Sequence, residues 1–166
     1  MGEARRPAGS SDEVRLLFFR SAGERFVLDV AYVREIIPHP PVTPVPFVPP
    51  TVAGIVNHRG VIYTLIRFSR LAGFGEDRAG SVALLRLPDM AVGIAVEAIE
   101  GIQTVPGRML RDGADGASVT APFLRRVSDR AGEFVHAIDA EQLIDAIYRL
   151  PGLAHAGEPA REPTRG

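Results

Sequence analysis

A proline-rich stretch at residues 38–50 is the feature that most constrains how this chain folds. It contains seven of the fourteen prolines and separates two apolar segments. Because proline has no backbone N–H, Pro38 ends the apolar run at residues 32–37. The fixed φ angles also leave the stretch little conformational entropy to lose on folding. We therefore expect an extended segment that crosses from one part of the fold to another.

The apolar runs elsewhere are short and bounded by turn residues, which is typical of a small, mainly β protein. Strands are expected at residues 14–19, 26–30, 61–66, 82–87, 90–96 and 133–138. The first two form a hairpin around a turn at residues 21–24. Residues 61–66 and 82–87 are apolar enough to be buried on both faces, whereas the alternation in residues 90–96 predicts a half-buried strand.

Three short helical segments are also predicted. Asp29 is placed to cap one or two turns that run through Ile37, and another turn is expected at residues 69–74. Asp139 caps a C-terminal helix, which Pro151 ends. One stripe of that helix carries Leu143, Ile144, Ile147 and Leu150.

We expect one folded unit at residues 14–150, flanked by disordered tails at residues 1–13 and 151–166. Both tails are rich in glycine, proline, alanine and charge, and neither shows apolar periodicity. Within the folded unit, residues 107–121 have few apolar side chains and several glycines, so a mobile loop is predicted there.

Composition excludes several classes of protein. The net charge is −1 at pH 7, which favours neither nucleic acid nor an anionic membrane surface as a partner. The absence of cysteine excludes disulfides, thiolate metal sites and thiol catalysis. No apolar run approaches the roughly 20 residues of a membrane-spanning helix, and the N-terminus lacks the apolar core of a secretory signal. We therefore expect a cytoplasmic protein without direct membrane insertion.

The residues that commonly carry catalysis do not form a recognisable set. The histidines are His39, His58, His136 and His155. Of these, only His58 lies within a motif, and no G-x-S-x-G elbow or H-E-x-x-H pair is present. The segment around Asp112 and Asp115 lacks the alternating oxygens and the closing glutamate of a calcium loop. We expect no enzymatic activity, no metal and no cofactor.

Residues 33–60 carry the most specific motif in the chain, reading V-x-E-I, then V-T-P-V-P, then V-x-G-I-V-N-x-R-G. This order and spacing resembles the CheW family, the adaptors of bacterial chemosensory arrays, and a weaker resemblance extends over residues 14–150. It implies a mainly β fold of two SH3-like five-stranded barrels packed side by side, with short helices and a C-terminal helix. It also implies a non-enzymatic adaptor that couples chemoreceptors to a CheA-type histidine kinase in chemotaxis.

The resemblance further implies two groups of residues that contact the receptor. The chemoreceptor tip is expected to contact Asn57, Arg59 and Gly60 at the junction of the barrels. A receptor helix is expected to lie in a groove lined by Val33 and Ile36, by helix-in-groove recognition. We assign contact with the regulatory domain of the kinase to Arg67 and Arg111.

Each of these positions has a structural alternative. Arg59 has the donors to brace a turn through backbone carbonyls, Asn57 is a common turn former, and Gly60 suits a positive φ. Val33 and Ile36 have the spacing of plain core residues. Glu35, which lies between them, is either a solvated charge or the partner of a nearby arginine. Residues 41–44 and 46–49 match the P-x-x-P pattern of SH3 ligands, with burial as a connector the alternative.

The sequence departs from the family pattern at several positions. Thr64 stands where proline is usual, Arg67 where aspartate is usual, and Phe68 where leucine is usual. His58 stands where an apolar residue is usual. The family also commonly has a glycine near the position of Arg125 and Arg126. These departures leave the fold in place but bear on which partners are bound. The alternative functions are a divergent interaction module in another two-component or motility pathway, and a small-ligand-binding β-barrel.

Overall fold

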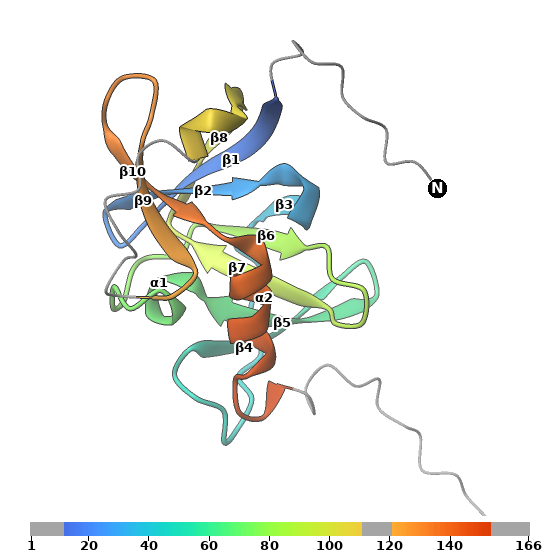
Figure 1. Ribbon diagram of the computed structural model, residues 1–166. Helices are drawn as coiled ribbons and strands as arrows, with labels where there is room; N and C mark the ends of the chain where they lie inside the picture. Colours follow the sequence, from blue (N-terminus) through green and yellow to red (C-terminus); the bar gives the residue numbers. More distant parts are fainter. Residues whose placement is uncertain (1–11, 111–120, 154–166) are drawn as a thin grey trace, which may run out of the picture.

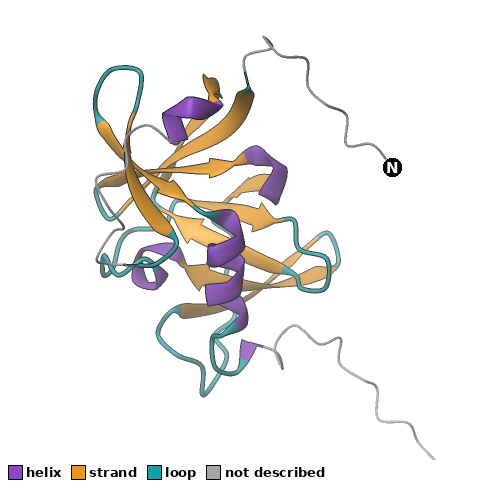
Figure 2. Cartoon of the chain, viewed as in Figure 1, coloured by secondary structure: helices purple, strands orange, loops and turns teal. Residues whose placement is uncertain are grey.

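The computed structural model describes residues 12–110 and 121–153, which form ten strands and four short helical segments (Figures 1 and 2). The first sheet has the strand order β8-β1-β2-β10-β9, and the second has the order β3-β6-β7-β5-β4. The first consists of β1 (Glu13–Ser21), β2 (Glu24–Asp29), β8 (Ala98–Pro106), β9 (Leu124–Ser128) and β10 (Phe134–Ile138). The second consists of β3 (Val33–Pro38), β4 (Val52–His58), β5 (Val61–Arg67), β6 (Ser81–Leu85) and β7 (Val92–Val96). The predicted mainly β fold with two five-stranded units is confirmed.

The two sheets share one pairing plan. Each has a single parallel pair, β2 with β10 in the first sheet and β5 with β7 in the second, and antiparallel neighbours elsewhere. If β8, β9, β10, β1 and β2 are matched in that order to β3, β4, β5, β6 and β7, the two sheets have the same arrangement of neighbouring strands. The order of the strands along the chain in one sheet is thus a circular permutation of the order in the other. The second sheet is built from one continuous segment, whereas the first combines β1 and β2 from the start of the folded chain with β8, β9 and β10 from its later part (Figure 1).

Alternate side chains of the strands enter different cores. Leu16 and Phe18 of β1 belong to a small cluster within the first sheet, whereas Leu17 and Phe19 belong to a larger cluster that includes residues of both sheets. In β6, Val82 and Leu84 likewise enter a cluster of the second sheet's own. Because successive side chains point to opposite faces of a strand, both faces are buried where the two sheets meet. This explains why β7 is buried throughout rather than half-buried as predicted.

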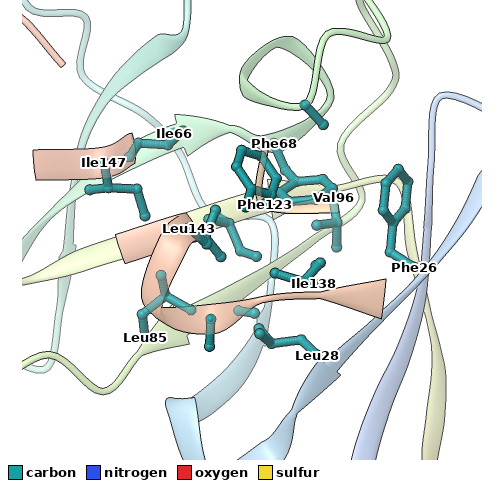
Figure 3. Packing of buried hydrophobic residues seen from close by; sticks show 14 of the residues in the cluster. Phe26, Leu28, Ile66, Phe68, Leu85, Val96, Phe123, Ile138, Leu143 and Ile147 are labelled. Carbon is teal, nitrogen blue, oxygen red and sulfur yellow. The ribbon is translucent and has the colours of Figure 1, made fainter. Parts of the chain in front are cut away.

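The larger cluster forms the seam between the sheets and contains a group of aromatic rings (Figure 3). The ring centroid of Phe68 lies 5.0 Å from that of Phe19 and 4.8 Å from that of Phe26, both in edge-to-face arrangements. Such pairs contribute about 0.5–1.5 kcal/mol each beyond their buried area. Helix α2 (Ala140–Tyr148) adds Leu143 and Ile147 to the same seam.

The C-terminal helix confirms its predicted signals. The side chain of Asp139 accepts a hydrogen bond from the backbone N–H of Gln142 at 3.1 Å, which satisfies one free donor of the first turn. The chain remains packed beyond the predicted boundary at residue 150, because Leu153 is buried in the seam. At the other end, β1 already begins at Glu13. The remaining residues of the two predicted tails, 1–11 and 154–166, lie outside the described part of the chain.

The proline-rich connector, residues 39–51, runs beside the edge of β4. Thr43 and Ile55 exchange two backbone hydrogen bonds of 2.9 Å, so the connector covers part of a free strand edge. Gly54 permits this approach, since a Cβ there would lie 2.2 Å from the carbonyl oxygen of Thr43. At Phe47 the φ angle is 62°. Polyproline II requires a negative φ, so residues 46–49 do not present a P-x-x-P ligand in this conformation.

One prediction about local structure was wrong, and a second was right in kind but shifted in its bounds. The helix expected from Asp29 through Ile37 is only the 3-10 turn η1 (Val30–Tyr32), in which Asp29 accepts a hydrogen bond from Ala31 at 2.9 Å. The residues that follow form β3, because pairing with β6 outweighs the local helical signal. Helix α1 (Phe68–Leu71) begins one residue before the predicted segment and is shorter.

Three further strands, β4, β8 and β9, were not predicted from the sequence. Strand β8 is largely exposed, and its Ile99, Ile102 and Val105 recur every third residue rather than every second. Strand β9 carries two consecutive arginines, so neither strand shows a clear apolar alternation. The predicted loop at residues 107–121 begins with the 3-10 segment η2 (Gly107–Leu110). Residues 111–120 lie outside the described part of the chain.

Candidate partner-binding site

The loop between β4 and β5 is a two-residue turn made by Arg59 and Gly60. His58 pairs with Val61 across the hairpin, and φ is 51° at Arg59 and 83° at Gly60. Positive φ at both positions is typical of a type I′ turn, whose twist matches that of the strands. The Oδ1 atom of Asn57 accepts a hydrogen bond from the Gly60 N–H at 3.0 Å. The turn-forming alternatives for Asn57 and Gly60 are therefore confirmed.

The side chain of Arg59 projects from this turn and is 75% exposed. Its Nη2 atom lies 3.2 Å from Oε1 of Glu35 on β3. Among the described residues the guanidinium thus contacts a carboxylate rather than the turn carbonyls of the alternative interpretation. An exposed ion pair of this kind contributes at most about 1 kcal/mol, so the guanidinium remains available to a partner.

His58 contacts the same carboxylate. Its Nε2 atom lies 3.0 Å from Oε2 of Glu35. Because an ionised carboxylate only accepts hydrogen bonds, the N–H group at Nε2 donates this hydrogen bond to Glu35. Strands β3 and β4 are the two edges of the second sheet, so Glu35 links one edge to the turn that follows the other. We call Glu35, Asn57, His58, Arg59 and Gly60 the β4–β5 tip.

Exposed apolar side chains follow the tip directly. Val61 is 43% exposed and Ile62 is 46% exposed, although the sequence predicted a strand buried on both faces from residue 61 onward. The burial begins only at Tyr63 and continues to Ile66. An open groove beside Val61 is lined by Arg34, Val61, Tyr63, Leu85, Leu87, Pro88, Asp89, Met90 and Ala91. No signal in the sequence distinguished Val61 and Ile62 from the buried residues after them.

The structure places Val33 and Ile36 in or against the core. Val33 is 8% exposed and belongs to the seam, and the partly buried Ile36 packs against that cluster. Val33 therefore offers almost no surface to a receptor helix, and its core alternative fits its position. Neither Val33 nor Ile36 lines the groove beside the β4–β5 tip.

Arg67 makes contacts within the chain. It occupies the N-cap position of α1, where its side chain makes no capping hydrogen bond. Instead, Nη1 donates to the carbonyl oxygens of Pro50 at 2.6 Å and Val52 at 3.1 Å. The aspartate usual in the family is a strong N-cap residue, so the departure replaces a helix cap with a brace on the connector. Its contact with a kinase stays a prediction, and Arg111 lies outside the described residues.

Within residues 12–110 and 121–153, no group of three or more histidine, aspartate or glutamate side chains is arranged to hold a metal ion. Over the same residues, no helix has the length and apolar character needed to cross a membrane.

Comparison with known proteins decides the family. The family model of the CheW-like domain matches residues 15–148. The chain belongs to the CheW family. It is 32% identical over 138 residues to the chemotaxis protein CheW of Rhizobium meliloti (strain 1021), covering 81% of this chain and 89% of that protein. It is 24% identical over 151 residues to the chemotaxis protein CheW of Thermotoga maritima, covering 88% and 97% of the two chains.

A solved CheW structure has the same fold. The crystal structure of the scaffolding protein TtCheW from Thermoanaerobacter tengcongensis superposes with a TM-score of 0.63 at 18% identity, covering 76% of this chain and 88% of that one. Membership of the CheW family makes the chain a non-enzymatic scaffolding adaptor of chemotaxis. The predicted family and the predicted absence of enzymatic activity are thereby confirmed.

Proposed function

We propose that this CheW-family protein joins a chemoreceptor tip to the regulatory domain of a CheA-type histidine kinase in a cytoplasmic array. The observation that carries the proposal is the β4–β5 tip. Arg59 is exposed on a rigid turn, beside the exposed apolar side chains of Val61 and Ile62. A cation next to apolar surface suits a helix that presents both acidic and apolar residues.

The receptor interface includes Asn57, Arg59 and Gly60, with Val61 and Ile62 beside them. Asn57 and Gly60 act by fixing the turn, since their polar atoms are bonded to each other. Val33 and Ile36 act through the seam that supports β3. The protein contributes geometry rather than chemistry: receptor and kinase held in one assembly change each other's state through differential contacts.

Calorimetry with two soluble probes tests the proposal: the cytoplasmic fragment of a chemoreceptor and the regulatory domain of a CheA-type kinase, both encoded in the same genome. Micromolar affinity, about −8 kcal/mol, is expected for each without ATP or metal. Arg59→Gly keeps a residue suited to positive φ and removes the guanidinium. It should weaken receptor binding by about 1–3 kcal/mol without lowering the melting temperature.

Arg149→Ala is the matched control. Arg149 is 79% exposed and also pairs with one carboxylate, that of Asp145 at 3.0 Å. It should bind the receptor fragment as the wild type does. Absence of complex with both probes would overturn the proposed function. Normal receptor binding by Arg59→Gly would remove Arg59 from the interface.

A divergent module of another two-component or motility pathway is the second candidate. The departure at Arg67 has a reason within the chain, because its guanidinium braces the connector. His58 lies within the tip itself, so this departure bears on the partner. Co-purification from cells, followed by identification of the captured kinase and receptor, distinguishes the two pathways.

A further inference from the structure

His58 and Arg59 of the β4–β5 tip both contact one carboxylate, that of Glu35. Nε2 of His58 lies 3.0 Å from Oε2 of Glu35, and Nη2 of Arg59 lies 3.2 Å from Oε1 of the same side chain. When His58 is neutral, the charges of Glu35 and Arg59 balance. When His58 is protonated, two cations face one carboxylate and the group carries one net positive charge. The charge that the tip presents therefore depends on the protonation of His58.

The elements around His58 add little that would mask this change. Across the hairpin, β5 places Val61 opposite His58 and Ile62 opposite Asn57, and neither is ionisable. The connector and β4 contain no ionisable residue from Pro40 to Val56. On β3, Glu35 faces His58, while Arg34 lines the adjacent groove with Val61.

The side chains are also placed where a partner can reach them. Those of His58 and Glu35 are 22% and 30% exposed, and Arg59 is far more exposed. When His58 is neutral, Arg59 is the only cation among the described residues that contacts Glu35. Protonated His58 takes a share of that carboxylate, so that Arg59 is freer to pair with a second carboxylate brought by the partner.

We propose that His58 makes partner binding at the β4–β5 tip proton-linked, and that the partner presents a carboxylate beside apolar side chains. The inference rests on the proposed function, since it assumes that the tip is an interface. His58 is a positioning residue in this scheme, because it acts through Glu35 on Arg59. The apolar requirement follows from the exposed Val61 and Ile62 next to the turn.

The sign of the effect follows from the charges. Histidine side chains ordinarily titrate near pH 6.5, and a partner carboxylate stabilises the protonated tip. Binding should therefore take up protons and be tighter at low pH. An exposed ion pair contributes about 0.2–1 kcal/mol, which corresponds to an affinity gain of about 1.4- to fivefold between pH 8.0 and pH 6.0. Raising the salt concentration should remove this gain, because exposed charges are screened.

The test is calorimetry of the full chain with the chemoreceptor fragment at pH 6.0 and 8.0, in two buffers of different ionisation enthalpy. Wild type is compared with His58→Leu, which places there the residue type usual in the family, and with His58→Gln, which keeps a donor for Glu35 but does not titrate. Both variants should lose the low-pH gain and the proton uptake. Glu24→Gln is the matched control, because it removes the charge from a histidine–glutamate contact of the same length, 3.0 Å, between His136 and Glu24. It should retain both effects.

Comparing the variants removes any titration of the receptor fragment itself. If wild type, His58→Leu and His58→Gln show the same pH dependence and proton uptake, the inference fails while the proposed function stands. If wild type alone binds more tightly at pH 8.0, protonation repels the partner and the inference also fails. If neither wild type nor the variants bind at either pH, the proposed function fails and takes the inference with it.

Discussion

Arg67 donates a hydrogen bond from Nη1 to the carbonyl oxygen of Pro50 at 2.6 Å, which ties the end of β5 to the last part of the proline-rich connector. The same nitrogen lies 3.1 Å from the carbonyl oxygen of Val52, and the Arg67 backbone N–H donates to Thr51 at 2.7 Å. Arg67 thus donates hydrogen bonds to the backbone carbonyl oxygens of three consecutive residues. Because prolines cannot donate hydrogen bonds, a proline-rich segment depends on such external donors.

Replacing Arg67 with aspartate exchanges this brace for a helix cap. Arg67→Asp loses two hydrogen bonds from a charged donor and gains one cap on the short helix α1, so the free energy of unfolding should fall by about 0.5–1.5 kcal/mol. Urea denaturation measures the change, with Arg149→Ala, which loses only an exposed ion pair, as the control. Unchanged or higher stability would show that the cap outweighs the brace.

The same variant tests the predicted contact with the kinase. If Arg67 also faces an acidic patch of the kinase, Arg67→Asp should slow association and flatten its dependence on ionic strength, because rim charges act mainly on the on-rate. Stopped-flow measurements over a range of salt concentrations compare it with wild type. Identical rates and salt slopes would limit Arg67 to its role within the chain.

Thr64 carries a buried hydroxyl without a hydrogen-bond partner in the described structure. Its side chain is 1% exposed, while its backbone N–H donates to Ala91 at 2.9 Å. Thr64→Val keeps the shape and the backbone hydrogen bond but removes the unsatisfied group, so the free energy of unfolding should rise by about 1 kcal/mol. Thr43→Val, at an exposed position, should stay within about 0.5 kcal/mol of wild type. A loss of stability in Thr64→Val would reveal a partner for the hydroxyl.

Phe47 combines full exposure with a φ of 62°. Its ring makes no core contact to lose, and asparagine tolerates the left-handed region better than phenylalanine. Phe47→Asn should therefore raise the free energy of unfolding by about 0.5–1 kcal/mol. Phe47→Val should change it in the opposite direction, since a β-branched residue fits positive φ poorly. Chemical denaturation of both variants measures the sign of each change in the free energy of unfolding. Equal changes would contradict the backbone explanation.

Asp129 predicts a specific dependence of stability on pH. Burial raises its pKa, but hydrogen bonds from the Glu133 backbone, from Arg25 and from the Ala131 backbone lower it by more, so the pKa lies below the usual 3.8. A carboxylate with a depressed pKa stabilises the folded state above its unfolded pKa. That contribution is lost as the pH falls through the lower folded value.

Asp129→Asn keeps an acceptor for the two backbone N–H groups but loses the 3.0 Å ion pair with Arg25. It should be less stable than wild type by about 1 kcal/mol at pH 7, and the difference should shrink below about pH 4. Asp145→Asn, in an exposed pair on α2, should show a difference of less than about 0.5 kcal/mol. Unfolding curves from pH 7 to pH 3 make the comparison, and a difference independent of pH would contradict the assignment.

Local sequence signals determined much of this protein. Asp139 predicted the start of the C-terminal helix, because a cap needs only its own side chain and the next turn. Asn57 and Gly60 predicted the turn after β4 for the same reason. The prolines predicted an extended connector, since their effect on the backbone does not depend on distant residues. The motif at residues 33–60 identified the family for the same local reason: its residue types occur at fixed short spacings.

Only the tertiary structure decided the rest. Strand β8 forms because β1, far earlier in the chain, supplies its partner, and its own sequence shows no clear apolar alternation. Burial of Val33 and exposure of Val61 depend on where the second sheet meets the first. Glu35 meets His58 and Arg59 only because two edges of one sheet come together. Contacts between distant segments cost chain entropy and depend on the whole fold, so no short window of sequence specifies them.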